Sequence, residues 1–342
     1  MKDRSVVLTF LTLLGAVPPL AAQQSIRRQV IVMGTQLQLD VVAPTRAVAL
    51  QSSEAVVRAV EAVEQRLSTW CANSEVSRVN AAALGEPVRL AGDTWHDLQW
   101  AFGIAERTGH AFDPTVGSLV ETYRLPTGGR WPSTSELALA LAAMGPTAFG
   151  FDAGAVVRRA SGARLATDAF AKGVALDRAG VAAMAAGATG STFDFGGQWA
   201  VFGDPGREIS VALAHPEHRG AEVARLRVRA GQSAATSGNG DRRATVDGRS
   251  LGHLFDPRNG QPAADFGSVT AIAQSAALAD AASTALFVLG PERGLQMARE
   301  LGIEAVFVEC LGEAGAAKSP RAVRLRMTPG LHDFLVTTEQ PR

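Results

Sequence analysis

The sequence predicts an α+β fold in which mostly antiparallel sheets are covered by helices. Short runs with the alternating apolar pattern of β-strands recur along the chain, often beside glycine turns. Between them lie long segments with apolar residues at helical spacing, and β ribbons alternating with such helices favour this class. The 342 residues are 46% hydrophobic, which is enough for one large or two ordinary domains with a substantial core.

The charge balance excludes some partners. The chain has 33 basic and 33 acidic residues, so it offers no general attraction to nucleic acid or to an anionic membrane. No internal repeat or low-complexity tract is present. The composition is therefore that of a globular protein with a specific site.

Residues 1–22 have the order of a signal peptide. Lys2 and Arg4 precede a short apolar run, residues 6–14, and Ala21–Ala22 supply small residues for cleavage before Gln23. The run is too short for a stable transmembrane helix. We expect export to the periplasm, with an uncleaved membrane anchor as the alternative.

A hairpin and three helices are expected in the first half of the mature chain. Residues 30–42 alternate apolar and polar positions around Met33–Gly34, which predicts a hairpin with a glycine turn. Residues 45–67 repeat valine and leucine at helical spacing. Further helices are expected over residues 93–108 and 172–187.

The second half is expected to contain more strands, two helices and a polar tail. Strand patterns occupy residues 209–213, 225–228, 268–273, 305–308 and 324–327. One helix opens near Ser275, a separate one spans 291–302, and residues 337–342 form the tail. The domain between the signal peptide and the tail is residues 23–336.

Asp280 and Thr284 are the first candidates for a metal site. They lie four residues apart in an alanine-rich helix, so they share one face of a helix that is expected to be buried. A buried carboxylate needs compensation, and Mg²⁺ accepts carboxylate, hydroxyl and carbonyl oxygens. The alternative is that Asp280 caps a backbone amide or pairs with an arginine, while Thr284 bonds back to its own helix.

A turn just before this helix holds an imidazole and a carboxylate together. Residues 253–262 read HLFDPRNGQP, and their proline, asparagine and glycine content predicts a tight turn. His253 is a candidate general base, because an unperturbed imidazole titrates near neutral pH. Asp256 is the second catalytic candidate, and it could instead fix the turn or orient His253.

Two further sets of residues are possible ligands or crosslinks. His215 and His218 are three residues apart, but Pro216 between them favours an exposed turn over a zinc-binding helix. Cys71 and Cys310 could pair in an oxidising compartment, and two isolated thiols are the alternative.

Taken in order, these motifs resemble the FAD:protein FMN transferases of the ApbE family. The most specific part is the turn at 253–262 followed by ADAASTAL at 279–286. Other parts of the resemblance are Met33-Gly34-Thr35, the stretch around Trp70, FDPTVG at 112–117, AKG at 171–173, the paired glycines at 196–197 and the strand end at 236–242. The resemblance extends over about residues 29–330.

The resemblance implies a site. Mg²⁺ would be held by Asp280, Thr284 and the backbone carbonyl of Ala169. The implied cofactor-binding residues are Met33, Trp70, Phe112, Asp113, Thr115, Lys172, Asp177, Gly196, Gly197 and His253. The indole of Trp70 would stack on the isoalloxazine ring. Ala166 stands where the family usually has aspartate, and Asp168 where glycine or serine is common.

The resemblance also implies a reaction. FAD is cleaved at its diphosphate, FMN passes to a threonine or serine of an acceptor protein of a membrane or periplasmic redox system, and AMP leaves. Positioning and charge neutralisation dominate such phosphoryl transfers. The family fold is two-lobed, with the flavin site in the cleft between the lobes. The alternatives are a periplasmic FAD pyrophosphatase, which yields FMN and AMP, and a non-catalytic FAD-binding protein.

Overall fold

The computed structural model describes residues 23–240, 243–312, 321–331 and 334–337. The predicted signal peptide, residues 1–22, lies outside the described residues. The α+β prediction is confirmed, since helices and antiparallel sheets both make up the described chain.

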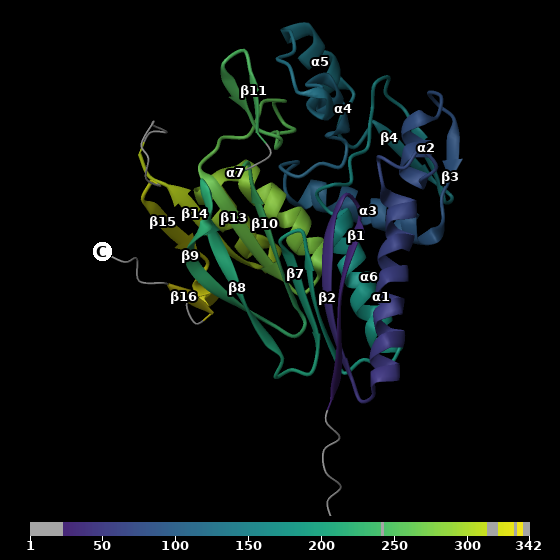
Figure 1. Cartoon of the computed structure of the whole chain (residues 1–342). Coiled ribbons are helices and arrows are strands. Elements are labelled where there is room, and N and C mark those ends of the chain that lie inside the picture. Colours follow the sequence, from purple (N-terminus) through teal and green to yellow (C-terminus); the bar gives the residue numbers. More distant parts are fainter. Residues whose placement is uncertain (1–22, 241–242, 313–320, 332–333, 338–342) are drawn as a thin grey trace, which may run out of the picture.

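An eight-stranded sheet forms the centre of the fold (Figure 1). Its strands follow the order β1-β2-β6-β7-β10-β13-β14-β15, and each neighbouring pair is antiparallel. The strands are β1 (Gln24–Val32), β2 (Thr35–Ala43), β6 (Gly190–Phe195), β7 (Gln198–Gly203), β10 (Gln232–Gly238), β13 (Gly267–Ala273), β14 (Glu304–Cys310) and β15 (Val323–Met327). The predicted hairpin is confirmed as β1 and β2, with Met33 and Gly34 at its turn.

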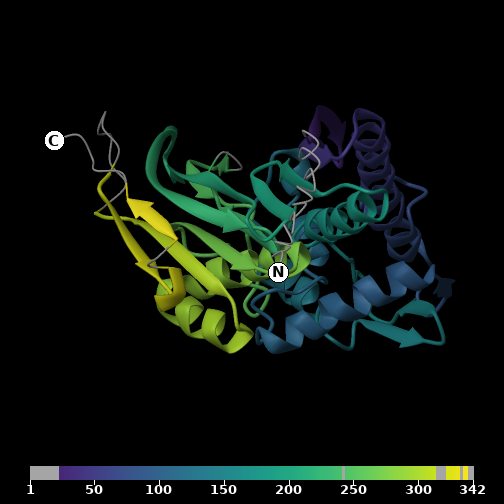
Figure 2. The same cartoon turned by 90° about the horizontal axis from the view of Figure 1, so that it is seen from below.

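Three helices, α1 (Arg46–Leu67), α6 (Ala171–Ala185) and α7 (Ala276–Leu301), pack with the sheet. Figures 1 and 2 both place α1 beside α6, and α7 lies against β10 and β13. The spacing that predicts α1 follows the face it buries, which carries Val56, Val60, Val63 and Leu67. This packing brings the N-terminal halves of α6 and α7 together.

A second, three-stranded sheet covers another part of the core. It consists of β8 (Glu208–His215), β9 (His218–Arg229) and β16 (Leu335–Thr337). Its apolar side chains pack on those of β7, β10, β13 and β14. The predicted tail begins at Thr337, but Thr337 pairs with Ala224 of β9 as the last residue of β16.

The remaining elements form two smaller groups. One comprises α2 (Glu75–Ala81), α3 (Gly92–Arg107), β3 (Pro87–Arg89), β4 (Phe149–Asp152) and β5 (Ala155–Arg158). The other comprises α4 (Gly117–Thr122), η1 (Leu125–Thr127), α5 (Thr134–Ala142), β11 (Ala244–Val246) and β12 (Arg249–Leu251), and η2 (Pro329–Leu331) follows β15. In the second group, Tyr123 and Phe255 stack with ring centroids 4.5 Å apart, and the Tyr123 hydroxyl donates to the Gly260 carbonyl at 3.0 Å. These contacts anchor the 253–262 turn.

The helix that opens at Ser275 and the helix expected after it follow each other directly within α7. The separate helix expected from Pro291 is confirmed, because Gly290, with a φ of 73° and a ψ of 174°, is non-helical and divides α7 into two helical segments, the second of which begins at Pro291 and ends at Leu301. Proline is tolerated after the kink because the first residue of a helical segment needs no amide donor. Among the described residues, no helix has both the length and the apolarity needed to cross a bilayer.

Candidate active site

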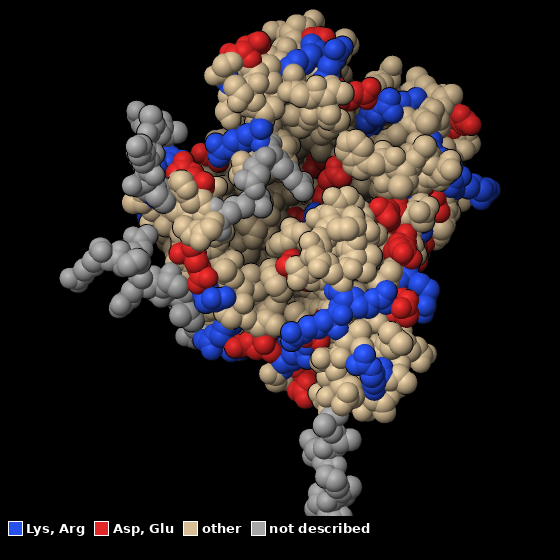
Figure 3. All heavy atoms as spheres, viewed as in Figure 1, with Lys and Arg blue, Asp and Glu red and all other residues tan. Residues whose placement is uncertain are grey.

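A cavity of about 410 Å³ opens among α4, α6, α7, the end of β10 and the 253–257 segment. The space-filling view shows a hollow in this face of the molecule (Figure 3). The predicted site residues that line the cavity are Trp70, Phe112, Asp113, Ala169, Lys172, Gly196, His253, Asp280 and Thr284. Residues from motifs up to 214 positions apart (70 to 284) therefore share one cavity.

Asp280 is the buried carboxylate of this cavity. Only 7% of the residue is exposed, and its Oδ2 accepts a hydrogen bond from the Gly173 amide at 3.1 Å. Lys172 Nζ lies 3.5 Å from both carboxylate oxygens. Burial raises the pKa of Asp280, while Lys172 and the Gly173 amide act in the opposite direction. The alternative partners expected for Asp280 are thus present: a backbone amide donates to its carboxylate, and a basic side chain lies beside it, which is a lysine and not the expected arginine.

A glycine makes this contact possible. A Cβ at Gly173 would collide with the backbone of Ala276 and Ala277 at the start of α7. Because Gly173 has no Cβ, α6 and α7 approach closely enough for the Gly173 amide to reach Asp280. The AKG sequence therefore contributes a cation and a close helix crossing at the same point.

Hydroxyl groups surround the adjacent face of α7. Thr284 Oγ1 lies 3.4 Å from Ser237 Oγ, and Ser237 Oγ lies 2.8 Å from Ser283 Oγ. Ser283, rather than Thr284, bonds back to the helix, since its hydroxyl donates to the Asp280 carbonyl at 2.9 Å. The cavity thus presents a carboxylate and a hydroxyl, with Ala169 in the same wall. These hard oxygen donors fit Mg²⁺.

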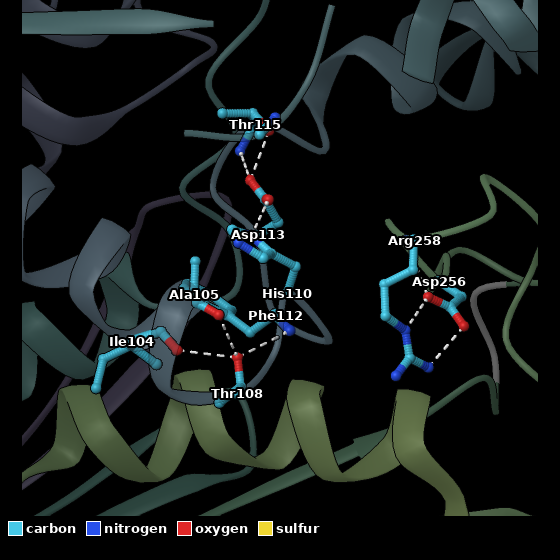
Figure 4. A network of polar contacts seen from close by, with 10 residues as sticks. Ile104, Ala105, Thr108, His110, Phe112, Asp113, Thr115, Asp256 and Arg258 are labelled. Carbon is cyan, nitrogen blue, oxygen red and sulfur yellow. Dashed lines mark hydrogen bonds and ion pairs between the residues drawn. The ribbon is translucent and has the colours of Figure 1, made fainter. Parts of the chain in front are cut away.

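His253 and Asp256 share a turn, but only one of them lines the cavity. His253 lines the cavity, whereas Asp256 is outside the lining. Asp256 Oδ1 accepts from Arg258 Nε at 2.7 Å, and Oδ2 accepts from Arg258 Nη2 at 2.7 Å (Figure 4). Burial opposes ionisation of Asp256, but the bonds from Arg258 hold its pKa below the usual range. This position fits the turn-fixing role better than a catalytic one.

The FDPTVG loop is held by its own polar side chains (Figure 4). Asp113 Oδ1 accepts from the Thr115 amide at 2.8 Å and from the Thr115 hydroxyl at 2.5 Å, while Oδ2 contacts His110 Nδ1 at 2.9 Å. Thr115 Oγ1 also accepts from the Gly145 amide at 2.9 Å. Phe112 and Asp113 therefore face the cavity, and Thr115 lies outside its lining and orders the loop.

Trp70 and the paired glycines belong to the cavity wall and its neighbourhood. Trp70 is 73% exposed and lines the cavity, so its indole face is available to a planar ligand. Gly196 and Gly197, with φ of 62° and 87°, form the tight turn between β6 and β7. Gly196 lines the cavity, whereas the Gly197 amide donates to Asp194 Oδ1.

Four of the implied cofactor-binding residues lie outside the lining, namely Met33, Thr115, Asp177 and Gly197. Met33 is at the β1–β2 turn, where its amide donates to Glu64 at 2.8 Å and its side chain packs against the core. Asp177 accepts from the Ser275 hydroxyl and from the Ala276 and Ala277 amides at 2.7–3.0 Å. It therefore binds the N-terminus of α7 and positions the helix that carries Asp280.

Several lining residues were not singled out from the sequence. Val120, Leu125 and Pro126 form an apolar wall, and Leu254 and Phe255 belong to the 253–262 turn, next to its polar candidates. Nothing in the spacing of Val120, Leu125 and Pro126 relates them to the other motifs. Ser237 was within a strand end that resembles the family, but its contact with α7 emerges only from the fold.

A further group of possible metal ligands, found among the described residues, already has partners within the protein. His215, Glu217 and Cys310 have ligand atoms within 4.8 Å of one another. His215 Nε2 donates to the Arg321 carbonyl, Nδ1 accepts from the Glu217 amide, and the Glu217 carboxylate pairs with Arg321 at 2.7 Å. His218 is exposed, and Cys71 and Cys310 are free thiols.

Comparison with known proteins agrees with this fold. An antiparallel α+β fold of this kind is that of flavin transferases: the apo flavinyl transferase ApbE of Pseudomonas stutzeri matches with a TM-score of 0.77 and 25% identity, over 91% of this chain and 97% of that one. The ApbE protein of Thermotoga maritima matches with a TM-score of 0.74 and 28% identity, over 83% and 94%. This protein therefore belongs to the class of transferase enzymes.

Comparison at the level of sequence identifies the family to which this chain belongs. Residues 33–307 match the model of the ApbE family, and this chain belongs to that family. An FAD:protein FMN transferase of Klebsiella pneumoniae is 28% identical over 89% of this chain and 87% of its own length. Another, from Rhodobacter capsulatus, is 33% identical over 69% of this chain, and the match spans 46% of that longer protein.

Proposed function

We propose that this enzyme transfers FMN from FAD to a threonine or serine hydroxyl of an acceptor protein, in a Mg²⁺-dependent reaction that releases AMP. The observation that carries the proposal is the shared cavity. It combines a buried carboxylate, a hydroxyl, an imidazole and an exposed indole, contributed by Asp280, Thr284, His253 and Trp70. Relatives named FAD:protein FMN transferase support the same activity.

The proposed metal ligands are Asp280, Thr284 and the Ala169 carbonyl. When bound there, Mg²⁺ would neutralise charge on the FAD diphosphate. Lys172, from the same wall, would add a second positive charge for the phosphates. Trp70 would contact the isoalloxazine ring, while Asp177 and Gly173 keep α7 in place.

The residues of the chain would then guide one displacement. A hydroxyl oxygen of the acceptor attacks the FMN phosphorus, and the bond from that phosphorus to the bridging oxygen breaks, so the oxygen leaves with AMP. The hydroxyl proton passes to a ring nitrogen of His253. Asp256, held by Arg258, would fix the turn that presents this imidazole. The apolar wall near Val120 limits water in the cavity.

A second hollow beside the cavity suits the acceptor. It is lined by α2, α4, η1 and residues 164–168, and it shares Trp70, Val120, Pro126, Ala166 and Asp168 with the cavity. An extended acceptor segment lying there would reach the shared wall without crossing the flavin-binding space. We expect the acceptor to belong to a membrane or periplasmic redox system, in keeping with the signal-like residues 1–22.

Incubation of the purified enzyme with FAD, Mg²⁺ and a candidate acceptor tests the function. Flavin fluorescence that stays with the acceptor band after denaturation is the expected result. Formation of free FMN and AMP with no labelled acceptor would instead favour an FAD pyrophosphatase. Export is tested separately by N-terminal sequencing of protein recovered from the periplasm, where a start near Gln23 is expected and a cytoplasmic chain with Met1 would contradict it.

A further inference from the structure

The ammonium group of Lys172 occupies the position from which a cation would approach Asp280. Nζ is 3.5 Å from Asp280 Oδ1 and 3.5 Å from Oδ2. It also donates to the Asp168 carbonyl at 3.1 Å. The side chain of Lys172 is 24% exposed, whereas that of Asp280 is 9% exposed, so the lysine covers the open side of a buried carboxylate.

A divalent cation at Asp280 would compete with this ammonium group. Both need the same carboxylate oxygens, and two positive charges a few ångströms apart repel each other in a partly desolvated cavity. The Gly173 amide, by contrast, contacts only Oδ2 and belongs to the backbone of the first turn of α6, so it can remain in place. Lys172 is therefore the group that must move.

A lysine can leave a carboxylate more easily than an arginine can. Lysine occurs only three times among the 33 basic residues, at positions 2, 172 and 318, so this chain uses arginine almost everywhere else. A lysine ammonium is a compact point charge on a flexible stem, whereas an arginine guanidinium grips a carboxylate through two parallel bonds. The cavity that Lys172 lines offers room for the diphosphate of FAD as its new partner.

We propose that Lys172 is an internal competitor for the cation at Asp280, and that the FAD diphosphate draws Lys172 away, so that cation and FAD bind cooperatively. This inference rests on the proposed function, because it takes Asp280 as a metal ligand and FAD as the substrate. Its consequence is that the cation binds weakly until FAD is present. By linkage, the factor by which FAD strengthens cation binding equals the factor by which the cation strengthens FAD binding.

Metal binding, rather than activity, tests the proposal. Mn²⁺ binding is measured by electron paramagnetic resonance and Mg²⁺ binding by calorimetry, with and without FAD, in the intact protein. Without FAD, Lys172→Met is expected to bind Mn²⁺ about tenfold more tightly than the wild type, which corresponds to ~1.4 kcal/mol. Lys172→Arg is expected to bind it more weakly than the wild type, because the guanidinium holds the carboxylate more firmly. The strengthening by FAD should shrink in Lys172→Met.

Arg178→Met is the matched control. Arg178 lies on the same helix and pairs with Asp93 and Asp97, so the variant loses the same charge away from the cavity and should keep wild-type metal affinity. Unchanged or weaker Mn²⁺ binding by Lys172→Met without FAD would overturn the competition. If that happened while Asp280→Ala abolished metal binding in the presence of FAD, the metal site of the proposed function would stand. If the wild type and Lys172→Met both failed to bind Mn²⁺ even with FAD, both proposals would fall.

Discussion

Replacing Asp280 by alanine is expected to abolish transfer while changing the stability of the fold only slightly. The Gly173 amide loses its acceptor, which costs about 1–3 kcal/mol for a buried donor. Removal of a carboxylate whose burial is unfavourable offsets part of this loss, and the partly exposed Lys172 can turn to water. We therefore expect a net loss of at most about 2 kcal/mol. At roughly 2–4 °C per kcal/mol, the melting temperature falls by less than ~8 °C.

The effect on catalysis should be much larger. Charge neutralisation by a bound cation is worth several kcal/mol in the transition state, so loss of its carboxylate ligand should slow transfer about 10³-fold or more. Excess Mg²⁺ should restore only part of the rate. Transfer rate, Mg²⁺ dependence and melting temperature are measured on the same preparation, so that activity is expressed per folded molecule.

Asp177→Ala is the matched control at the same helix crossing. Asp177 binds the N-terminus of α7 through three hydrogen bonds, so its loss should destabilise the fold by about 0.5–2 kcal/mol, as loss of a helix cap does. Ser275 still caps the helix through the Leu278 amide, and transfer per folded molecule should persist. The metal-site assignment is refuted if Asp280→Ala turns over normally, or if Asp177→Ala loses as much activity per folded molecule.

Three other outcomes are expected. His253→Ala should keep its affinity for FAD and Mg²⁺ while single-turnover transfer slows ~10²–10⁴-fold; a parallel loss of FAD affinity would make the imidazole a binding group. Ala81→Trp, at an exposed position that lines only the second hollow, should raise KM for the acceptor and leave FAD binding intact, and an unchanged KM would exclude this route. Burial raises the pKa of Asp97 above the ordinary 3.8, although Arg66 acts in the opposite direction. Ionisation of Asp97 therefore costs more in the folded protein than in the unfolded chain, and the wild type loses stability relative to Asp97→Asn as pH rises through the raised pKa. The difference in melting temperature between the two should therefore grow in favour of Asp97→Asn from pH 3.5 to 7, and a constant difference would contradict it.

Local patterns in the sequence determined much of this protein. The four-residue spacing of Asp280 and Thr284 placed both on one face of a helix, and both line the same cavity. The Met33–Gly34 turn and the buried face of α1 followed from the same kind of pattern. Such features depend on backbone geometry and on side-chain periodicity over a few residues, which the sequence displays directly. The expected division into two lobes stays a prediction.

Only the tertiary structure decided what each polar group contacts. Asp177 was expected beside the cofactor, but it binds the start of α7, and Asp256 pairs with Arg258 instead of facing the cavity. Lys172 is implied by the resemblance as a cofactor-binding residue, and the structure places its ammonium group 3.5 Å from Asp280, a residue 108 positions away in the sequence. The contacts of Asp177 and Lys172 depend on how closely two helices distant in sequence pack, whereas the Asp256–Arg258 pair lies within one turn. Here that closeness is set by a missing side chain at Gly173 and by the crossing of α6 with α7, which no spacing along the chain reveals.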